Sequence, residues 1–157
     1  MIEIERKFLV KSDAYKNEAT SKKRIVQGFL NTHPNRTVRV RIKGNNGFLT
    51  IKGISNEAGT SRFEWEKEIE VLEAKSLLKL CEETIIDKTR FEIPIRGFVV
   101  EVDEFHGANE GLVIAEIELE NENDAFERPK WLGEEVTGQL KYYNSLLSKK
   151  PYKSWEK

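Results

Sequence analysis

Residues 37–53 read TVRVRIKGNNGFLTIKG, and this stretch decides the fold. Apolar and polar side chains alternate through residues 37–43 and again through residues 48–53, which is the period of a strand with two unlike faces. The GNNG cluster between them favours a tight hairpin, because glycine and asparagine tolerate positive φ. The stretch therefore predicts two antiparallel strands, each with one apolar and one charged face.

The same alternation continues along the chain. It gives eight candidate strands, at residues 2–10, 24–31, 37–43, 48–53, 63–70, 84–93, 98–105 and 112–120. Apolar residues at helical spacing predict helices at residues 73–83 and 138–148, and a shorter one from Ser12 or Asp13 to Ala19. Many antiparallel strands with few helices indicate an α+β fold. Eight strands favour a closed antiparallel barrel, which removes the sheet edges, with helices packed outside.

Composition limits the class of protein. The 157 residues suit a single domain, which we assign to residues 1–150 with a tail at 151–157. Lys plus Arg (26) and Asp plus Glu (27) nearly cancel, which argues against a nucleic-acid binder. The single cysteine excludes a disulfide framework, and no apolar run reaches the roughly 18 residues of a membrane span. We expect a cytoplasmic protein with no nucleic-acid or membrane partner.

The charged faces of the strands carry blocks of one sign. Basic residues dominate the third, fourth and sixth strands, and acidic residues the fifth, seventh and eighth. For one strand, the ordinary interpretation is the solvated side of a sheet. Six such strands together favour another interpretation, because like charges on neighbouring positions repel each other. If the barrel closes with this face inward, it encloses a charged tunnel.

Such a tunnel suits a metal–polyphosphate complex. Crowded carboxylates need protons or metal ions to neutralise them, and hard divalent cations prefer oxygen ligands. Crowded arginines and lysines call for a polyanion, and the arginine fork matches phosphate oxygens. The sequence contains no GxxxxGK[ST] loop, so side chains must bind the phosphates.

The motifs on these strands resemble those of one family. The run EIERK at residues 3–7 is similar to the ExExK motif of the CYTH superfamily, the triphosphate tunnel metalloenzymes. RVR at 39–41, TIKG at 50–53, EWE at 64–66, KTR at 88–90, EVD at 101–103 and EIE at 116–118 follow in the order of that family. WLGEEVT at 131–137 and KYYN at 141–144 resemble the C-terminal plug segment of compact bacterial members.

The resemblance implies a closed eight-stranded tunnel with a C-terminal plug helix, and it implies roles for the charged residues. The substrate-binding residues would be Lys7, Arg39, Arg41, Lys52, Lys88 and Arg90. The metal ligands, for Mg²⁺ or Mn²⁺, would be Glu3, Glu5, Asp103, Glu116 and Glu118. Glu64, Glu66 and Glu101 would serve catalysis, by orienting water or holding a second metal. Gln139 stands where an aspartate is more usual, so Lys141 receives no role.

Members of this family hydrolyse inorganic triphosphate, thiamine triphosphate or RNA 5′ triphosphates, or cyclise ATP. The EIERKFLV opening and the VTG and KYYN segments favour a metal-dependent hydrolase of a small triphosphate, most simply inorganic tripolyphosphate. The alternatives are a class IV type adenylate cyclase and a non-catalytic binder of polyphosphate or nucleotide. The sequence also leaves open whether the protein forms a homodimer.

Overall fold

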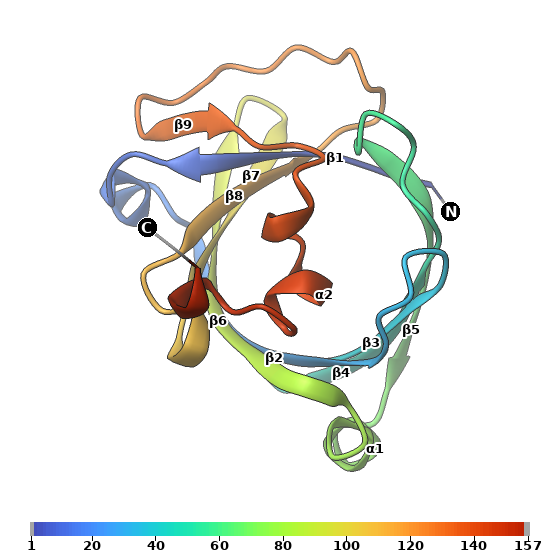
Figure 1. The fold of residues 1–157 in the computed structure, drawn as a ribbon. Coiled ribbons are helices and arrows are strands. Elements are labelled where there is room, and N and C mark those ends of the chain that lie inside the picture. Colours follow the sequence, from blue (N-terminus) through green and yellow to red (C-terminus); the bar gives the residue numbers. More distant parts are fainter. Residues whose placement is uncertain (1, 156–157) are drawn as a thin grey trace.

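The computed structural model describes residues 2–155, and for Glu83 the backbone alone. Within this range, eight strands form a barrel and a ninth lies outside it (Figure 1). The strands are β1 (Ile2–Val10), β2 (Ser21–Asn31), β3 (Thr37–Lys43), β4 (Asn46–Lys52), β5 (Ser61–Ile69), β6 (Glu82–Ile95), β7 (Phe98–Phe105), β8 (Val113–Glu118) and β9 (Leu132–Glu135). The helices are α1 (Val71–Leu78), α2 (Asn144–Leu147) and short 3₁₀ turns at Ala14–Asn17, Gly107–Asn109, Leu140–Tyr142 and Tyr152–Ser154.

The barrel closes through β1. The strand order is β5-β4-β3-β2-β6-β7-β8-β1, and the start of β1 returns to β5 by pairing Ile2 with Phe63 and Ile4 with Ser61. The rest of β1 pairs with β8, from Glu5 opposite Glu118 onward. All these pairs are antiparallel, so the predicted eight-stranded antiparallel barrel is confirmed.

The hairpin at residues 37–53 forms as predicted. Thr37 pairs with Lys52, Lys43 pairs with Asn46, and Gly44 takes a φ of 59° in the turn. Helix α1 begins two residues before the expected 73, because Glu70 and Glu73 form a capping box at its start. It packs on the outside of the barrel (Figure 1).

Strand β9 was not predicted. It pairs with the outer end of β1, with Phe8 opposite Glu135 and Val10 opposite Leu132. A side chain at Gly133 would lie 2.9 Å from the carbonyl oxygen of Leu9, so glycine permits this close approach. The four residues LGEE show no apolar alternation, so their pattern did not predict a strand.

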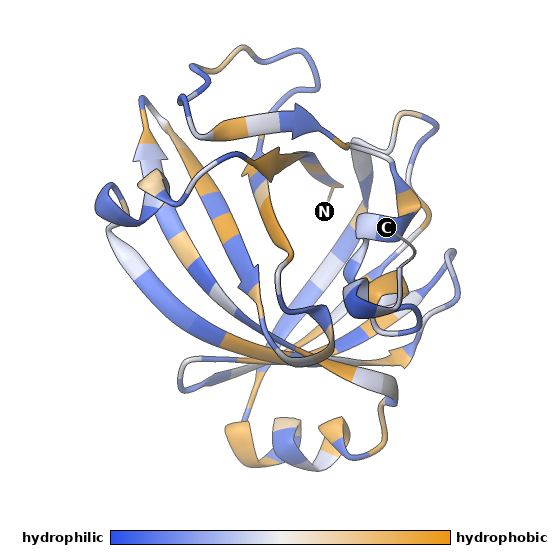
Figure 2. Ribbon diagram, turned by 60° about the vertical axis from the view of Figure 1, so that its left-hand side comes forward, coloured by the Kyte–Doolittle hydropathy of each residue, from blue (hydrophilic) through white to orange (hydrophobic). Residues whose placement is uncertain are grey.

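The two faces of the barrel wall bury different kinds of side chain. Outward-facing residues such as Phe8, Phe91 and Val102 form an apolar cluster with Tyr15 and Trp131, which close over them. The alternation of hydrophilic and hydrophobic positions is visible along the strands in Figure 2. The outer face thus supplies a hydrophobic core, and the charged faces point inward.

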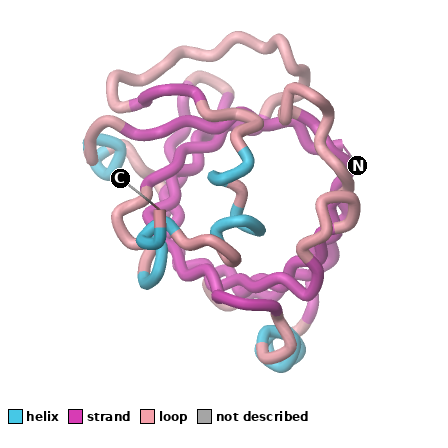
Figure 3. The backbone as a smooth tube through the Cα atoms, viewed as in Figure 1, coloured by secondary structure: helices cyan, strands magenta, loops and turns pink. Residues whose placement is uncertain are grey.

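The C-terminal segment enters the barrel and fills one end of it (Figures 1 and 3). The inward-facing side chains Ile86, Phe105 and Ile114 are apolar at this end and pack on Tyr142 and Leu147. The plug is therefore held by hydrophobic contacts, and the charged part of the tunnel lies beyond it.

The plug is not one helix over residues 138–148 as its apolar spacing predicts. A 3₁₀ turn and α2 are separated at Tyr143, which has an extended backbone with φ −72° and ψ 135°. Trp155, in the predicted tail, packs edge-on against Tyr142 at 5.5 Å between ring centroids, whereas residues 156–157 lie outside the described range. No helix among the described residues is long and apolar enough to cross a membrane.

Candidate active site

A cavity of about 230 Å³ occupies the charged part of the tunnel. The strands around the barrel and the plug contribute its wall. All six predicted substrate-binding residues line it: Lys7, Arg39, Arg41, Lys52, Lys88 and Arg90. Of the predicted metal and catalytic residues, the following line it: Glu3, Glu5, Glu64, Glu66, Glu101, Glu116 and Glu118. Alternation around a closed barrel thus brings together motifs that are far apart in sequence.

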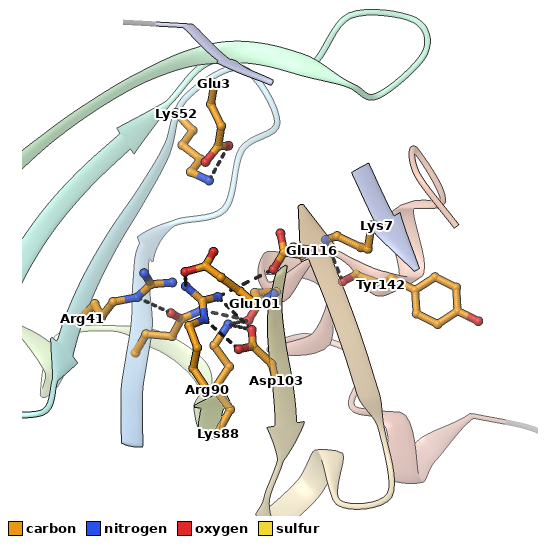
Figure 4. A network of polar contacts seen from close by, with 12 residues as sticks. Glu3, Lys7, Arg41, Lys52, Lys88, Arg90, Glu101, Asp103, Glu116 and Tyr142 are labelled. Atoms are coloured by element: carbon orange, nitrogen blue, oxygen red, sulfur yellow. Dashed lines mark hydrogen bonds and ion pairs between the residues drawn. The ribbon is translucent and has the colours of Figure 1, made fainter. Parts of the chain in front are cut away.

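Asp103 lies behind this wall. Its side chain is 1% exposed and accepts two hydrogen bonds from Arg90, at 2.8 and 2.9 Å, while Lys88 Nζ lies 2.7 Å away (Figure 4). Burial alone would raise the pKa of Asp103, but Arg90 and Lys88 lower it to about 2. Both oxygens of Asp103 are engaged by these two cations, so it supports the wall from behind.

Burial also acts on the cations. It lowers the pKa of Lys88 to about 7, against the opposing effect of Asp103. Burial thus makes the charged form of Lys88 less favourable than that of an exposed lysine, and the sequence did not indicate this. Arg90 stays charged, because Asp103 and Glu101 raise its pKa although burial opposes them. Glu101 accepts from Arg90 Nη1 at 3.2 Å.

Arg39 and Arg41 project from one face of β3 into the cavity. Arg39 donates to Thr50 Oγ1 at 3.0 Å and to Glu66 at 3.3 Å, but its Nε is buried without a partner. It is the one such side-chain atom among the described residues. Burial lowers the pKa of Arg41 well below its usual range, and neighbouring Arg39 and Arg90 lower it further. This part of the wall has more positive charge than its carboxylates balance, as an anion site requires.

The acidic side chains of the cavity wall include two close pairs. Glu116 and Glu5 are hydrogen-bonded to each other. Burial and the nearby charge of Glu116 raise the pKa of Glu5 well above its usual value. Burial would raise the pKa of Glu116 too, but Lys7 and the bond from Glu5 lower it well below that value. Within this pair, protonation is therefore favoured on Glu5 over Glu116.

A second acidic pair lies near the other side of the cavity. Lys52 Nζ lies 2.9 Å from Glu3 and 3.2 Å from Glu64, so the lysine bridges the two carboxylates (Figure 4 shows the contact with Glu3). Burial and a hydrogen bond with Glu3 raise the pKa of Glu64. Burial and the charges of Glu3 and Glu101 likewise raise the pKa of Glu118.

These carboxylates fit a hard divalent cation. No three of the acidic, histidine or cysteine side chains of the described residues already form a metal cluster. Magnesium needs no such cluster, since it binds through one or two carboxylates together with waters and substrate phosphates. A cation bound between Glu5 and Glu116 would relieve the repulsion that raises the pKa of Glu5. The donors are oxygens, which suits Mg²⁺ or Mn²⁺.

Several residues that line the cavity were not predicted from the sequence. Arg62 lies in phase with Glu64 and Glu66, one residue before the expected start of that strand, and its guanidinium lies 5.5 Å from the Tyr143 ring centroid. Asn144 lines the cavity, and the fully buried Gln27 contacts it from outside the lining. Both side chains are uncharged, so neither was indicated by the charge pattern. The unassigned Lys141 is exposed, and its ammonium lies over the rings of Tyr142 and Trp155.

A closed antiparallel barrel with cations and carboxylates around one internal cavity defines a tunnel protein for a metal-bound polyanion. The chain belongs to the CYTH domain family, whose domain matches residues 1–151.

Two relatives extend over nearly the whole chain. An inorganic triphosphatase of Acetivibrio thermocellus is 50% identical over 157 residues, covering 98% of this chain and 97% of its own. An inorganic triphosphatase of Nitrosomonas europaea is 35% identical over 153 residues, covering 94% and 97%. The crystal structure of the inorganic triphosphatase NE1496 superposes with a TM-score of 0.66 at 32% identity, covering 93% of each chain. These likenesses confirm the family resemblance predicted from the motifs.

Proposed function

We propose that this protein hydrolyses a small triphosphate, inorganic triphosphate first, to phosphate and diphosphate. The observation that carries the proposal is the cavity wall, where eight basic side chains and seven glutamates line a volume of about 230 Å³. The unpartnered Nε of Arg39 supports it, because a buried donor without an acceptor is costly unless a ligand supplies one. Two relatives of almost equal length bear the name inorganic triphosphatase.

In this proposal the cations bind the phosphates. Arg39 and Arg41 are two residues apart on β3, so their guanidinium groups face neighbouring phosphoryl groups. Lys52 and Lys7 approach from β4 and β1, and Arg90 from β6. Lys7, Lys88 and Arg90 are themselves buried, and a less polar environment strengthens their interaction with a bound anion. The reacting phosphate is thereby oriented and its negative charge neutralised before hydrolysis, the main requirement of phosphoryl transfer.

Glu3, Glu5, Glu116 and Glu118 would hold Mg²⁺ or Mn²⁺. When bound, the ion supplies Lewis-acid stabilisation of the phosphate oxygens. Asp103 would act indirectly, by keeping Lys88 and Arg90 in place, because both of its carboxylate oxygens already contact these two cations.

Water needs a proton acceptor, and Glu64 fits that role best. Its raised pKa brings it nearer to neutrality, where a general base is most effective. Glu66 accepts hydrogen bonds from Thr50 at 2.7 Å and Arg39 at 3.3 Å, so its role would be to position Arg39. Glu101 accepts from Arg90 and would hold that guanidinium in the same way.

The test is phosphate release from tripolyphosphate, pyrophosphate, thiamine triphosphate and ATP, with cyclic AMP measured in parallel. We expect Mg²⁺- or Mn²⁺-dependent release, fastest from tripolyphosphate. Formation of cyclic AMP without phosphate release would replace this proposal with a cyclase. Binding of tripolyphosphate without turnover, in the presence of either metal, would replace it with a binder.

A further inference from the structure

The plug packs apolar side chains into one end of the barrel, and it also contributes a polar side chain to the cavity. Asn144, the first residue of α2, lines the cavity. Its Oδ1 accepts hydrogen bonds from Lys88 Nζ at 3.0 Å and from Gln27 Nε2 at 2.9 Å. Gln27 in turn accepts from Arg41 Nε through Oε1 at 2.8 Å. Two neutral amides thus connect two cations of the wall, Arg41 and Lys88, both seen in Figure 4.

The orientation of both amides follows from their partners. Arginine can only donate, so the atom facing Arg41 is the oxygen of Gln27. Lys88 lies 2.7 Å from the Asp103 carboxylate, which favours its ammonium form, so it donates to the oxygen of Asn144. The nitrogen of Gln27 then faces the oxygen of Asn144, as a donor should. The donors and acceptors of the three hydrogen bonds are mutually consistent, so they define a single orientation for the amide of Asn144.

Neutral partners leave the charge of Arg41 available. In the described part of the chain, Arg41 forms no ion pair, whereas Lys52 and Arg90 each contact a carboxylate. Gln27 is fully buried at 0% exposure, and a buried polar group is tolerated only when it is hydrogen-bonded. A carboxylate at this position would satisfy Arg41 equally well but would cancel the charge that a phosphate needs.

The amide nitrogen of Asn144 remains free for a ligand. Both acceptor positions of Oδ1 are occupied, and Nδ2 makes no hydrogen bond to the described residues. Since Asn144 lines the cavity, its two N–H groups are placed beside Lys88, on the wall that binds anions.

We propose that Asn144 donates a hydrogen bond to a phosphate oxygen of the substrate, and that Gln27 is a positioning residue that holds Asn144 and Arg41 without neutralising the arginine. This inference rests on the proposed triphosphatase function. The plug then forms part of the substrate site, because Asn144 lies in the segment that fills one end of the tunnel and also contacts the ligand.

The test compares Asn144→Asp with wild type. The aspartate keeps both acceptor contacts but replaces the donor with a negative oxygen. We expect the Kd for tripolyphosphate, measured by calorimetry in EDTA, and the KM to rise about tenfold or more, with a smaller effect on kcat and no fall in Tm. Gln27→Glu should raise KM similarly, because its carboxylate competes with phosphate for Arg41. Asn45→Asp, the same change on the exposed β3–β4 turn, is the control for net charge and should leave Kd and KM unchanged.

The outcomes separate this inference from the proposed function. Wild-type turnover together with Asn144→Asp Kd and KM values within twofold of wild type overturns the inference and leaves the triphosphatase intact. A fall in Tm with unchanged Kd assigns the amides a structural role only and also overturns it. A wild-type protein that neither binds nor hydrolyses tripolyphosphate overturns the proposed function and the inference together.

Discussion

Arg39 combines a half-buried side chain, a buried Nε without a partner and a neighbouring arginine, which is costly for folding and useful for anion binding. Arg39→Ala should therefore raise the KM for tripolyphosphate about tenfold or more, because a charge-assisted hydrogen bond contributes roughly 1.5–3 kcal/mol. Its Tm should equal or exceed that of wild type, since the change relieves like-charge repulsion. Steady-state kinetics and thermal unfolding measure the two effects. Arg36→Ala, in the exposed β2–β3 loop, is the matched control; a lower Tm with normal KM for Arg39→Ala would mean a structural role.

The raised pKa of Glu5 predicts how the metal-free protein responds to pH. A carboxyl group with a higher pKa in the folded state stabilises the fold while it is protonated, and this contribution is lost as the pH rises through the folded pKa. The lowered pKa of Glu116 acts in a lower window, where stability is lost as the pH falls. In EDTA, the Tm should therefore decline as the pH is raised above the usual glutamate range, and Glu5→Gln should reduce that decline.

The prediction is checked by measuring the Tm of wild type and Glu5→Gln by thermal unfolding in EDTA across a pH series. Added Mg²⁺ should restore the Tm of the wild type most at the higher pH, because the cation takes the place of the proton. Glu57→Gln on an exposed loop is the matched control. Parallel pH profiles for wild type and Glu5→Gln would show that Glu5 is not the buried acid that the structure indicates.

At the scale of elements, the eight barrel strands were predictable because each has one face against an apolar shell and the other in a charged tunnel. Because of this contrast, apolar and charged residues alternate with a period of two along each strand. Strand β9 and the break at Tyr143 were not predictable, because both depend on partners far away in the chain. The charged site residues followed from the same period, whereas Gln27 and Asn144 are neutral and are identified only by their contacts.

Besides its backbone pairing, strand β9 is joined to β1 by an ion pair between Arg6 and Glu135. Arg6 donates to both oxygens of Glu135, at 2.8 and 2.7 Å, and Thr137 donates to the same carboxylate at 2.7 Å. Both side chains are partly exposed, so solvent screening limits the contribution to about 1 kcal/mol or less. Glu135→Gln should lower the Tm by roughly 2–4 °C and leave kcat and KM unchanged, because Arg6 faces away from the cavity.

The control for this pair is Glu127→Gln. Glu127 contacts Arg96 at 2.7 Å, but both side chains are largely exposed, and the substitution should not change the Tm measurably. Equal Tm values for the two variants would mean that β9 is held by its backbone pairing and by Leu132 and Trp131 in the apolar cluster.

At the scale of the whole molecule, the barrel encloses its ligand site, so binding and folding are linked. A ligand that binds only the folded state stabilises it by about 2.7 kcal/mol at one hundred times its Kd. Tripolyphosphate should therefore raise the Tm strongly, even in EDTA, since the cations of the wall are present without metal. Turnover should disappear in EDTA and return with Mg²⁺ or Mn²⁺, because the carboxylates of the wall need a cation to act on the phosphates.

Glu116→Gln separates the two halves of this linkage. It removes a carboxylate from the acidic pair but none of the cations, so turnover should fall by orders of magnitude while tripolyphosphate still raises the Tm. Differential scanning fluorimetry and phosphate release measure both effects on the same samples, and Glu120→Gln, on an exposed residue beyond β8, is the matched control. If Glu116→Gln loses the Tm shift together with the turnover, the carboxylate is needed for binding itself. The cations alone would then be insufficient, and the division of the wall into a phosphate-binding set and a metal-binding set would be wrong.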